Sequence, residues 1–378
     1  MQIKRVNQNC SNLLKRIDVD PRGVEIMAQK AEVLTFHITD IRCGAANILK
    51  QDALSVGAEF ALPYGTIECK NRYPEGVLIG SKRVLNTLAK KLHAQPYGLK
   101  DLGKKIQMFC QIKPKKRQLM AVLNANSDSF YPQSRFDNSS AQAVIQKLID
   151  QGADIIDIGA VSSRPGSSFC SQKEELERIG AILQLIKKHK LYTQCKFSID
   201  SFNEAVVKQA LDSGFCIIND ITGLKNGALA QLAKSYDAKL CIMHMQNDPQ
   251  TMQNDPTYED VTLEISDFFA KQIEKAKGYG LKQSDIILDV GIGFGKTARH
   301  NLELIANMEH FCQFGSEILV GASRKSVIDA IFKSGVEDRL AGTLALHMKA
   351  YENGANIIRV HDLYEHKQAF AMVDALRF

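Results

Sequence analysis

Four polar side chains stand at or just past the ends of short apolar runs in this sequence, and their types suit a flat, nitrogen-rich ring. They are two carboxylates, one amide and one amine: Asp200, Asn219, Asp289 and Lys325. Each carboxylate can accept hydrogen bonds from ring N–H or amino groups, whereas the lysine can donate to a carbonyl or a ring nitrogen. An ordinary salt bridge among these groups is the alternative that the residue types leave open.

A second group of side chains suits a phosphate. Arg359 and His361 lie two positions apart in an apolar run, so both point to the same side of a strand. Together with Arg324 and Lys325 they would form a cationic patch for phosphate or pyrophosphate. A structural histidine in a turn is the alternative for His361.

Oxygen-bearing side chains follow two of the apolar runs and could serve a metal ion. Asn124 and Asp128, with the loop SSRPG at residues 162–166, could supply ligands for a magnesium ion that a pyrophosphate carries. An ordinary turn rich in Asn, Ser and Asp would account for the same residues.

The stretch LDVGIGFGKTARHNL, residues 288–302, looks at first like a nucleotide loop, with three glycines before Lys296 and Thr297. A phosphate-binding P-loop would need glycine at position 290, where the chain has Val290. The dinucleotide pattern G-x-G-x-x-G would need glycine in place of Lys296. We therefore expect the glycines to let the loop pass close to a flat ligand, and Lys296 and Thr297 to begin the next helix.

Eight short β-rich runs alternate with amphipathic stretches from about residue 117 onward. The runs cover residues 119–126, 153–160, 196–200, 216–221, 239–245, 285–291, 317–323 and 356–362. Strands that alternate with helices build a parallel sheet, and eight such units predict a (β/α)8 TIM barrel with its site at the carboxyl ends of the strands. The polar residues named above stand at those ends.

The N-terminal part of the chain has a different pattern, which predicts a small α/β module of two or three strands with helices. Pro114, in a basic linker, marks its boundary. We therefore predict an α/β protein in which a small N-terminal domain over residues 1–115 precedes the barrel over residues 116–378. The residues of the N-terminal domain indicate no particular chemistry.

The composition indicates a globular protein with a small-molecule substrate. A hydrophobic fraction of 45% and a charged fraction of 24% are ordinary. No apolar run approaches the roughly 20 residues of a membrane span, and no secretory signal opens the chain. The net charge of +6 is spread along helical segments, so we expect an anionic small substrate and neither nucleic acid nor membrane as partner. The nine cysteines are scattered, and a reducing cytoplasm is their simplest location.

Nine stretches of the chain, in order, resemble those of dihydropteroate synthases and together cover about residues 117–378. They are LNANSDSF, GADIIDIGAVSSRPG, SIDSF, IINDITG, IMHMQNDPQTMQ, ILDVGIGFGKTARHNL, LVGASRKSVI, RLAGTLA and IIRVHD. The resemblance implies a transferase of folate biosynthesis, which condenses (7,8-dihydropterin-6-yl)methyl diphosphate with p-aminobenzoate to give 7,8-dihydropteroate and diphosphate. It also implies Mg2+ as cofactor, a cytoplasmic homodimer and a target for sulfonamides.

The resemblance also implies a role for each matching residue. The pterin ring would lie among Asp200, Asn219, Asp289 and Lys325, with Ile221 and Met243 against its face. Asn124 would bind magnesium, and the pyrophosphate would be held by Ser163, Arg359 and His361. Phe294 and Ser326 would lie beside the aminobenzoate, under a loop that contains Arg164. Lys325, Arg359 and His361 would be the catalytic residues.

The chain departs from the family pattern in the loops over the aminobenzoate. Asn126 and Ser127 replace Thr-Pro in the first loop, and Val161 replaces a glutamate in the second. One alternative is therefore a catalytically silent pterin-binding homologue. Another is a methyltetrahydrofolate–corrinoid methyltransferase, which shares the pterin-binding barrel. That reaction involves no phosphate, so Arg359 and His361 would have no role in it.

Overall fold

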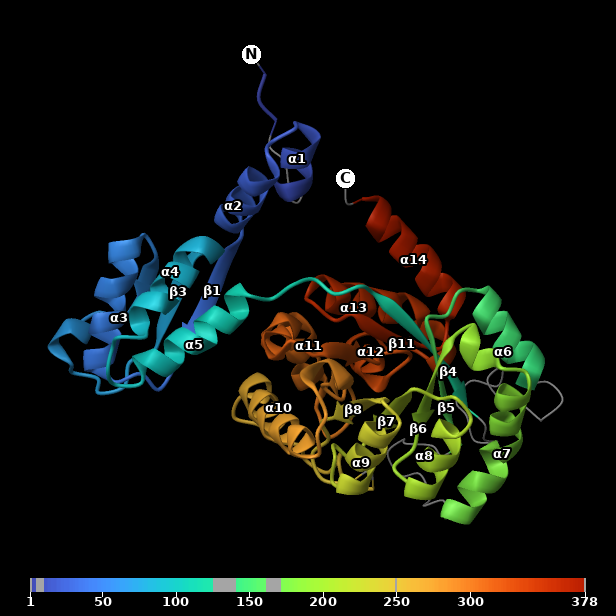
Figure 1. The fold of residues 1–378 in the computed structure, drawn as a ribbon. Coiled ribbons are helices and arrows are strands. Elements are labelled where there is room, and N and C mark those ends of the chain that lie inside the picture. Colours follow the sequence, from blue (N-terminus) through green and yellow to red (C-terminus); the bar gives the residue numbers. More distant parts are fainter. Residues whose placement is uncertain (1, 5–9, 125–140, 161–170, 249, 377–378) are drawn as a thin grey trace. The chain divides into compact units, whose positions relative to one another are not determined.

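Eight parallel strands close into a barrel in the C-terminal part of the computed structural model (Figure 1). The strands pair in the order β10-β11-β4-β5-β6-β7-β8-β9, and β9 pairs with β10 to complete the ring. The structure describes all residues except 1, 5–9, 125–140, 161–170, 249 and 377–378. The barrel strands are β4 (Gln118–Asn124), β5 (Ile155–Gly159), β6 (Lys196–Asp200), β7 (Ile217–Asp220), β8 (Lys239–Met243), β9 (Ile286–Asp289), β10 (Glu317–Val320) and β11 (Ile357–Val360).

A helix follows most strands, which confirms the predicted (β/α)8 architecture. These helices are α6 (Ala141–Asp150), α7 (Gln172–Lys188), α8 (Glu204–Leu211), α9 (Gly227–Ser235), α10 (Val261–Gly278), α11 (Ala298–Ala306), α12 (Ser326–Ile331), α13 (Leu340–Glu352) and α14 (Leu363–Ala375). Local sequence sets several of their starts. Ser171 caps α7 in a capping box with Glu174, and the Asp260 side chain accepts from the Leu263 amide at the start of α10.

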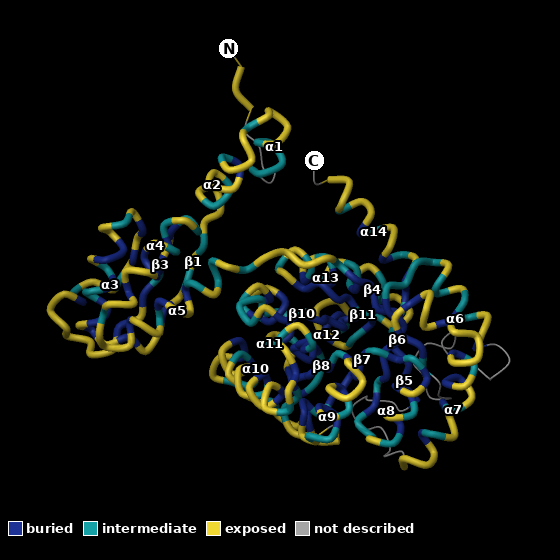
Figure 2. Tube along the Cα trace, in the orientation of Figure 1, coloured by how far each residue is buried: buried dark blue, intermediate teal, exposed yellow. Residues whose placement is uncertain are grey.

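The barrel strands are buried on both faces, which explains why they read as nearly continuous apolar runs (Figure 2). One set of alternate side chains fills the barrel interior: Met120, Ile155, Ile217, Cys241, Ile287, Leu319 and Ile357. At the amino ends of the strands, Gln118 donates to Glu317 at 2.8 Å and accepts from Lys196 at 3.0 Å. These two layers close the barrel below, so only the carboxyl ends of the strands can receive a ligand.

The N-terminal part of the chain forms a separate unit around a three-stranded antiparallel sheet of order β1-β3-β2. Contacts divide the protein into residues 1–112 with 372–378, and residues 113–371. Helices flank the sheet, and the core includes Leu49, Phe60, Leu78, Leu85 and Leu88. The elements of this unit are α1 (Cys10–Arg16), α2 (Pro21–Ala31), β1 (Val33–Ile38), α3 (Cys43–Val56), β2 (Glu59–Ala61), β3 (Gly76–Ser81), α4 (Lys82–Leu92) and α5 (Leu99–Cys110).

Cys43 and Cys69 form a disulfide within this N-terminal unit. Their spacing of 26 residues does not by itself indicate a pair, and the predicted reducing environment favours free thiols instead. The free cysteines of the described residues are Cys10, Cys110, Cys195, Cys216, Cys241 and Cys312.

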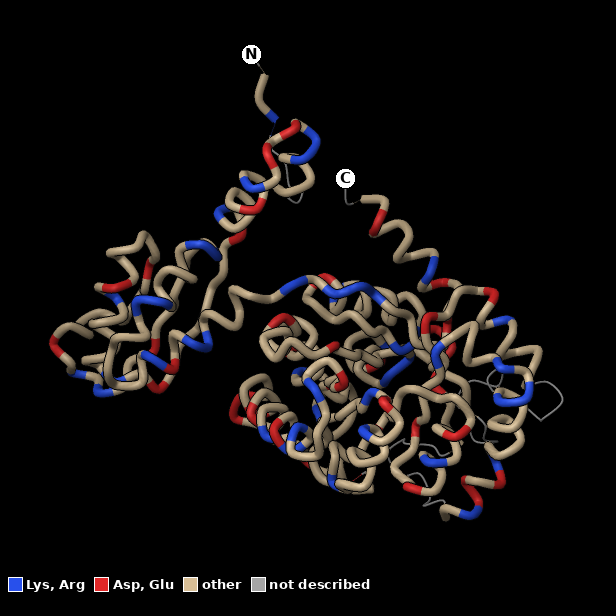
Figure 3. Tube along the Cα trace, in the orientation of Figure 1, with Lys and Arg blue, Asp and Glu red and all other residues tan. Residues whose placement is uncertain are grey.

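Lys and Arg residues are interspersed with Asp and Glu along the described elements, and the segment between α5 and β4 is distinctly basic (Figure 3). Within the barrel unit, Lys115 of that segment donates to the carbonyl oxygen of Gly315 at 2.5 Å. The Arg117 guanidinium lies 4.5 Å from the centroid of the Phe370 ring. None of the described helices is long and apolar enough to cross a membrane.

Candidate functional site

Charged side chains converge inside the barrel at the carboxyl ends of β5, β6, β7 and β11. Arg359 donates from Nε to Asp157 at 2.7 Å and from Nη2 to Asp200 at 2.8 Å. The Asn219 amide also donates to Asp157, at 3.1 Å. Because the Asp157 side chain is fully buried, its charge requires these partners. The predicted residues Asp200, Asn219 and Arg359 therefore form one network, which is centred on a residue that the sequence analysis did not single out.

Asp157 could have been found from the sequence by one signal. It is a lone carboxylate inside the apolar run Ile155-Ile156-Asp157-Ile158, and a buried charge in a parallel strand needs a specific partner. Its partner Arg359 is 202 residues away, so the pair becomes visible only when the barrel closes.

Asp289 and Lys325 occupy the neighbouring part of the barrel mouth. Asp289 ends β9 and accepts from the Gly291 amide at 2.8 Å. Burial raises the pKa of Asp289, against the opposing effect of Lys325. Burial also lowers the pKa of Lys325 to about 8, although Asp289 favours its charged form. Both residues therefore carry charges that the protein stabilises only in part, as expected where a polar ligand binds.

Asp200 has the most perturbed carboxylate of the site. Burial raises its pKa to about 7, against the favourable charge of Arg359 and with a further contribution from Asp157. Three carboxylates therefore share this region with the cations Arg359 and Lys325. Such a surplus of acceptors matches a ligand that presents several N–H donors.

The glycine-rich loop after β9 brings Phe294 over the lysine. Gly291, Gly293 and Gly295 have φ angles of 68°, 81° and 61°, which glycine adopts without strain. The Lys325 amine donates to the carbonyl oxygen of Ile292 and lies 4.5 Å from the centroid of the Phe294 ring. The loop thus wraps closely around the Lys325 amine. A loop that bound a nucleotide phosphate would not need this arrangement.

Lys296 and Thr297 have different roles at the end of this loop. Thr297 caps α11 and accepts from the His300 amide at 3.2 Å, in agreement with the expected helix start. Lys296 is buried and its amine lies 3.1 Å from Nδ1 of His244 and 2.9 Å from the carbonyl oxygen of Phe294. It therefore anchors the loop from within the protein.

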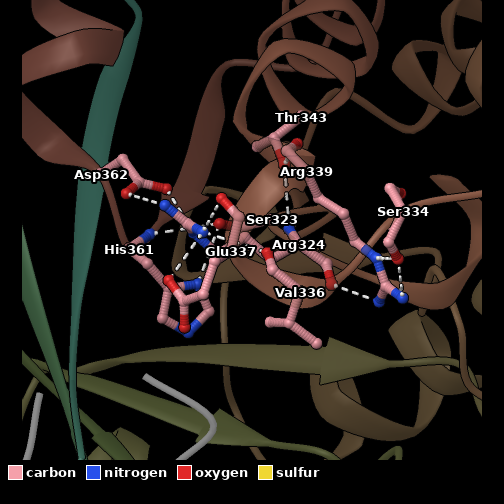
Figure 4. A network of polar contacts seen from close by, with 9 residues as sticks. All are labelled: Ser323, Arg324, Ser334, Val336, Glu337, Arg339, Thr343, His361 and Asp362. Atoms are coloured by element: carbon pink, nitrogen blue, oxygen red, sulfur yellow. Dashed lines mark hydrogen bonds and ion pairs between the residues drawn. The ribbon is translucent and has the colours of Figure 1, made fainter. Parts of the chain in front are cut away.

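His361 lies just past β11 beside Ser323, which follows β10. The His361 Nδ1 atom lies 2.9 Å from the Ser323 hydroxyl oxygen, and the His361 amide donates to the same oxygen at 3.3 Å (Figure 4). The serine thereby fixes the orientation of the ring and leaves Nε2 on the opposite side of the imidazole.

Two buried histidines stabilise the segments that carry Ser323 and His361. The Ala322 amide donates to Nε2 of His347 at 2.9 Å, and Nδ1 of His347 lies 2.8 Å from Nε2 of His366. Nδ1 of His366 in turn lies 2.6 Å from the carbonyl oxygen of Asp362. Each ring must accept at Nε2 and donate from Nδ1, so both are neutral. This histidine relay fixes the residues next to Ser323 and His361.

Arg324 does not belong to the phosphate patch, in contrast to the expectation from the sequence. Its guanidinium donates to both carboxylate oxygens of Asp362, at 2.7 and 2.9 Å (Figure 4). The remaining nitrogen donates to the carbonyl oxygens of Val336 and Glu337 at 3.0 and 2.9 Å. This side chain is buried and ties the loop after β10 to the end of β11, so it has a structural role.

The other residues implied by the resemblance lie around the same barrel mouth where the structure describes them. Met243 ends β8 opposite Asp289, and Ile221 follows β7; both are buried and apolar. Ser326 begins α12 and is exposed. Asn124 ends β4 and is half-buried. Ser163, Arg164 and Asp128 lie outside the described residues.

Comparison with known proteins identifies this barrel. The model of the pterin binding enzyme family matches residues 120–361. The Escherichia coli dihydropteroate synthase is 37% identical over 259 residues, which cover 68% of this chain and 90% of that protein. A crystal structure of the Yersinia pestis dihydropteroate synthase with a sulfonamide drug complex superposes with a TM-score of 0.66 at 33% identity, over 69% of this chain and 94% of that one.

A further relative extends over the N-terminal unit as well. It is the bifunctional dihydropteroate synthase/dihydropteroate reductase of Helicobacter pylori, 42% identical over 368 residues that cover 97% of this chain and 96% of that protein. The agreement of sequence and fold over the whole barrel favours a synthase over the methyltransferase and the silent homologue. The chain therefore belongs to the pterin binding enzyme family and, within it, to the dihydropteroate synthases.

Proposed function

We propose that the buried polar network at the barrel mouth binds the pterin ring of the diphosphate substrate. The observation that carries this assignment is the convergence of Asp157, Asp200, Asn219 and Asp289 beside the cations Arg359 and Lys325. The ring and amino N–H groups of a pterin would donate to the carboxylates, while Lys325 would donate to the ring carbonyl or a ring nitrogen. Met243 and Ile221 would lie against the faces of the ring.

The diphosphate would extend from the ring toward Arg359 and His361. Nε and Nη2 of Arg359 are held by carboxylates, which aims the guanidinium and leaves Nη1 for an anionic oxygen. The ring of His361, whose Nδ1 lies 2.9 Å from the Ser323 hydroxyl oxygen, would contact the same group. The assignment of Ser163 to the diphosphate concerns a residue outside the described ranges and rests on the resemblance alone.

Magnesium fits this arrangement as an ion carried by the diphosphate. Phosphate oxygens and water would supply most of its ligands. Among the described residues there is no group of three or more His, Cys, Asp or Glu side chains that could hold a metal ion, and Asp128 lies outside them. Asn124, at the end of β4, could supply one oxygen. Bound there, the ion would neutralise charge on the departing diphosphate.

The reaction then needs orientation and charge stabilisation more than acid–base catalysis. The bond between the pterin methylene and the diphosphate oxygen breaks, and its electron pair leaves with the diphosphate. The amine nitrogen of p-aminobenzoate forms the new bond to the methylene carbon and releases one proton to solvent. Arg359 and His361 would stabilise the charge that develops on the leaving group. Phe294 and Ser326 would border the aminobenzoate.

One assay tests the assignment. Release of diphosphate from (7,8-dihydropterin-6-yl)methyl diphosphate should require both magnesium and p-aminobenzoate. Asp289→Ala should abolish pterin binding, because the ring donors would then face an apolar gap. The control Asp285→Ala, at the amino end of the same strand, should bind normally. Unchanged pterin affinity in Asp289→Ala would refute the site.

A second substitution separates the two halves of the substrate. His361→Ala should weaken binding of the diphosphate form and leave the affinity for a pterin without phosphate unchanged. An equal loss for both ligands would place His361 at the ring instead. Sulfonamides should compete with p-aminobenzoate at this site, and chelation of magnesium should stop turnover.

The remaining family expectations concern the assembly and its compartment. We propose that the protein is a homodimer and that its partners are small-molecule substrates only. Light scattering tests the dimer directly. We also propose a cytoplasmic location, although a reducing compartment would favour Cys43 and Cys69 as thiols. Alkylation of the native protein from freshly lysed cells, followed by mass spectrometry, reports which form exists there.

The N-terminal unit supports a second activity as a proposal. The Escherichia coli dihydropteroate synthase matches 68% of this chain, whereas the bifunctional Helicobacter pylori protein matches 97% of it and so includes residues of the N-terminal unit. We propose that this unit reduces dihydropteroate, as the name of that relative says. The step would add a hydride and a proton across the remaining C=N bond of the dihydropterin ring and oxidise a hydride donor. Reduced nicotinamide and reduced flavin are the two donors to test with purified full-length protein.

A further inference from the structure

The N-terminal unit contains a cavity that is open to solvent and has a chemically mixed lining. Its volume is about 670 Å³, within the range for sites that take drug-sized ligands. Three segments that are distant in the sequence form it: residues 38–42 after β1, Tyr73, and residues 97–105 at the start of α5. All of these residues lie within residues 1–112, so the cavity is complete within one unit.

The cavity offers two flat side chains that the core does not use. Tyr73 and Tyr97 line it and are 44% and 67% exposed. Exposed tyrosines provide faces on which an aromatic ring can stack. The Arg72 guanidinium lies 5.6 Å from the centroid of the Tyr73 ring and supports it from one side.

The cavity also carries charges of both signs. Arg42 precedes α3, and Lys105 lies one turn after Asp101 on the same face of α5. Among the described residues, the side chains of Arg42 and Lys105 have no hydrogen-bond or ion-pair partner, whereas that of Asp101 pairs with Lys104 at 2.8 Å. Asp40 supplies a further carboxylate. A ligand with an anionic end and an N–H-rich end would satisfy both cations and Asp40.

The walls of this cavity are held in place. The Cys43 amide donates to the carbonyl oxygen of Arg72 at 2.9 Å, and the disulfide joins the start of α3 to the same loop. Asp40 and Tyr97 have φ angles of 54° and 59°, a conformation that residues other than glycine rarely adopt. Such backbone positions persist where the surrounding structure fixes them, and they concentrate at functional sites.

We infer that this cavity binds dihydropteroate, the product of the barrel, as the substrate of the proposed reductase. This inference rests on the second activity proposed above. Dihydropteroate has a flat pterin with an aminopyrimidinone edge, a second aromatic ring and a terminal carboxylate. The carboxylate would lie between Arg42 and Lys105, the rings against Tyr73 and Tyr97, and the aminopyrimidinone edge at Asp40.

The test counts binding sites on the full-length protein. Pteroate, the oxidised and stable analogue with the same carboxylate, is titrated by calorimetry. We expect two sites per chain in the wild type and one in Asp289→Ala, which loses the barrel site. Arg42→Gln/Lys105→Gln should weaken the second site by about tenfold or more, with synthase activity unchanged. The control Arg83→Gln/Lys90→Gln removes two exposed cations of α4 outside the cavity and should retain both sites.

A second probe identifies the contact that the cations make. 6-Methylpterin lacks the carboxylate, so the Arg42/Lys105 double variant should bind it as the wild type does. A single pteroate site in the wild type would overturn the inference, as would two sites that the double variant leaves intact. Two sites of which the double variant loses one, without any reduction of dihydropteroate, would support the cavity and refute the reductase activity. Reduction that the double variant leaves unchanged would refute the cavity and support the reductase.

Discussion

Removal of the Arg359 guanidinium should destabilise the barrel even in the absence of substrate. The substitution Arg359→Met leaves Asp157 and Asp200 without the cation that they share at 2.7 and 2.8 Å. The Asp157 side chain is 0% exposed and that of Asp200 is 10% exposed, so water cannot replace the arginine. Breaking such a buried pair on one side costs about 3–5 kcal/mol. This loss is a large part of the stability of an ordinary domain.

Hydrogen exchange measured peptide by peptide is the suitable assay, since it reads the barrel separately from the N-terminal unit. Peptides that cover β5, β6 and β11 should exchange about 10²- to 4 × 10³-fold faster in Arg359→Met, because each 1.4 kcal/mol corresponds to tenfold. Arg299→Met, which removes an exposed arginine of α11, should remain within about 0.5 kcal/mol of the wild type.

A rescue shows whether the stranded charge is the cause. Asp157→Asn in the Arg359→Met background removes the buried charge and should restore most of the lost protection. The defect of Arg359→Met should also shrink as the pH is lowered, because a stranded carboxylate can escape by protonation. Exchange rates in Arg359→Met that match those of Arg299→Met, or a double variant no better than the single one, would refute this account of the network.

Three further outcomes follow from the same site. Gly291→Ala should abolish pterin binding, because a Cβ at this position, where φ is +68°, would lie 2.0 Å from the carbonyl oxygen of His244. As a control, the added Cβ of Gly180→Ala in α7 meets no atom within 4 Å, and this substitution should stabilise the barrel by about 1 kcal/mol. Normal pterin binding by Gly291→Ala would contradict the close approach of the two backbone segments. The kcat/KM for the pterin substrate should fall above a pH of about 8, where the buried Lys325 loses its proton. In Lys325→Arg this decrease at high pH should be absent. A wild-type kcat/KM that stays constant to high pH would show that a charged Lys325 is not required. Acid should destabilise the barrel, because burial lowers the pKa of His244 to about 3 and the unfolded state takes up a proton on this histidine first. The loss of unfolding free energy begins below a pH of about 6.5 and reaches about 2 kcal/mol at pH 5. If the urea midpoint of His244→Asn keeps the whole pH dependence of the wild type, this histidine is not the cause.

The strands and the position of the site could be predicted from the sequence because both depend on local patterns. Buried parallel strands are short apolar runs, and a barrel presents its site where those runs end. Asp200 and Asp289 each end a strand and Asn219 is the penultimate residue of β7, so closure of the ring is enough to bring the three together.

The use of each cation could not be predicted in the same way, because it depends on partners that are distant in the sequence. Arg324 and Arg359 both stand near strand ends and carry the same group. The structure turns Arg324 outward onto Asp362, 38 residues away, and turns Arg359 inward onto Asp157, 202 residues away. Lys296 illustrates the same limit, since its burial depends on His244 at the end of another strand. The local sequence pattern therefore predicts which strand end carries a charged residue, but the tertiary contacts determine which partner that residue binds.

The balance of charges at the barrel mouth connects stability with function. Asp157, Asp200 and Asp289 lie near the cations Arg359 and Lys325, and the buried Lys296 also favours the charged form of Asp289. Burial nevertheless raises the pKa of Asp200 to about 7. A sequence selected for stability alone would replace one of these carboxylates, because a buried charge without a full partner is unfavourable. The barrel keeps all three, so it presents more acceptors than its own donors satisfy. In the proposed site, the N–H groups of a pterin edge would supply the missing donors. Pterin binding would then compensate the unpaired carboxylates, so the same charge imbalance that destabilises the ligand-free barrel would select a nitrogen-rich ring.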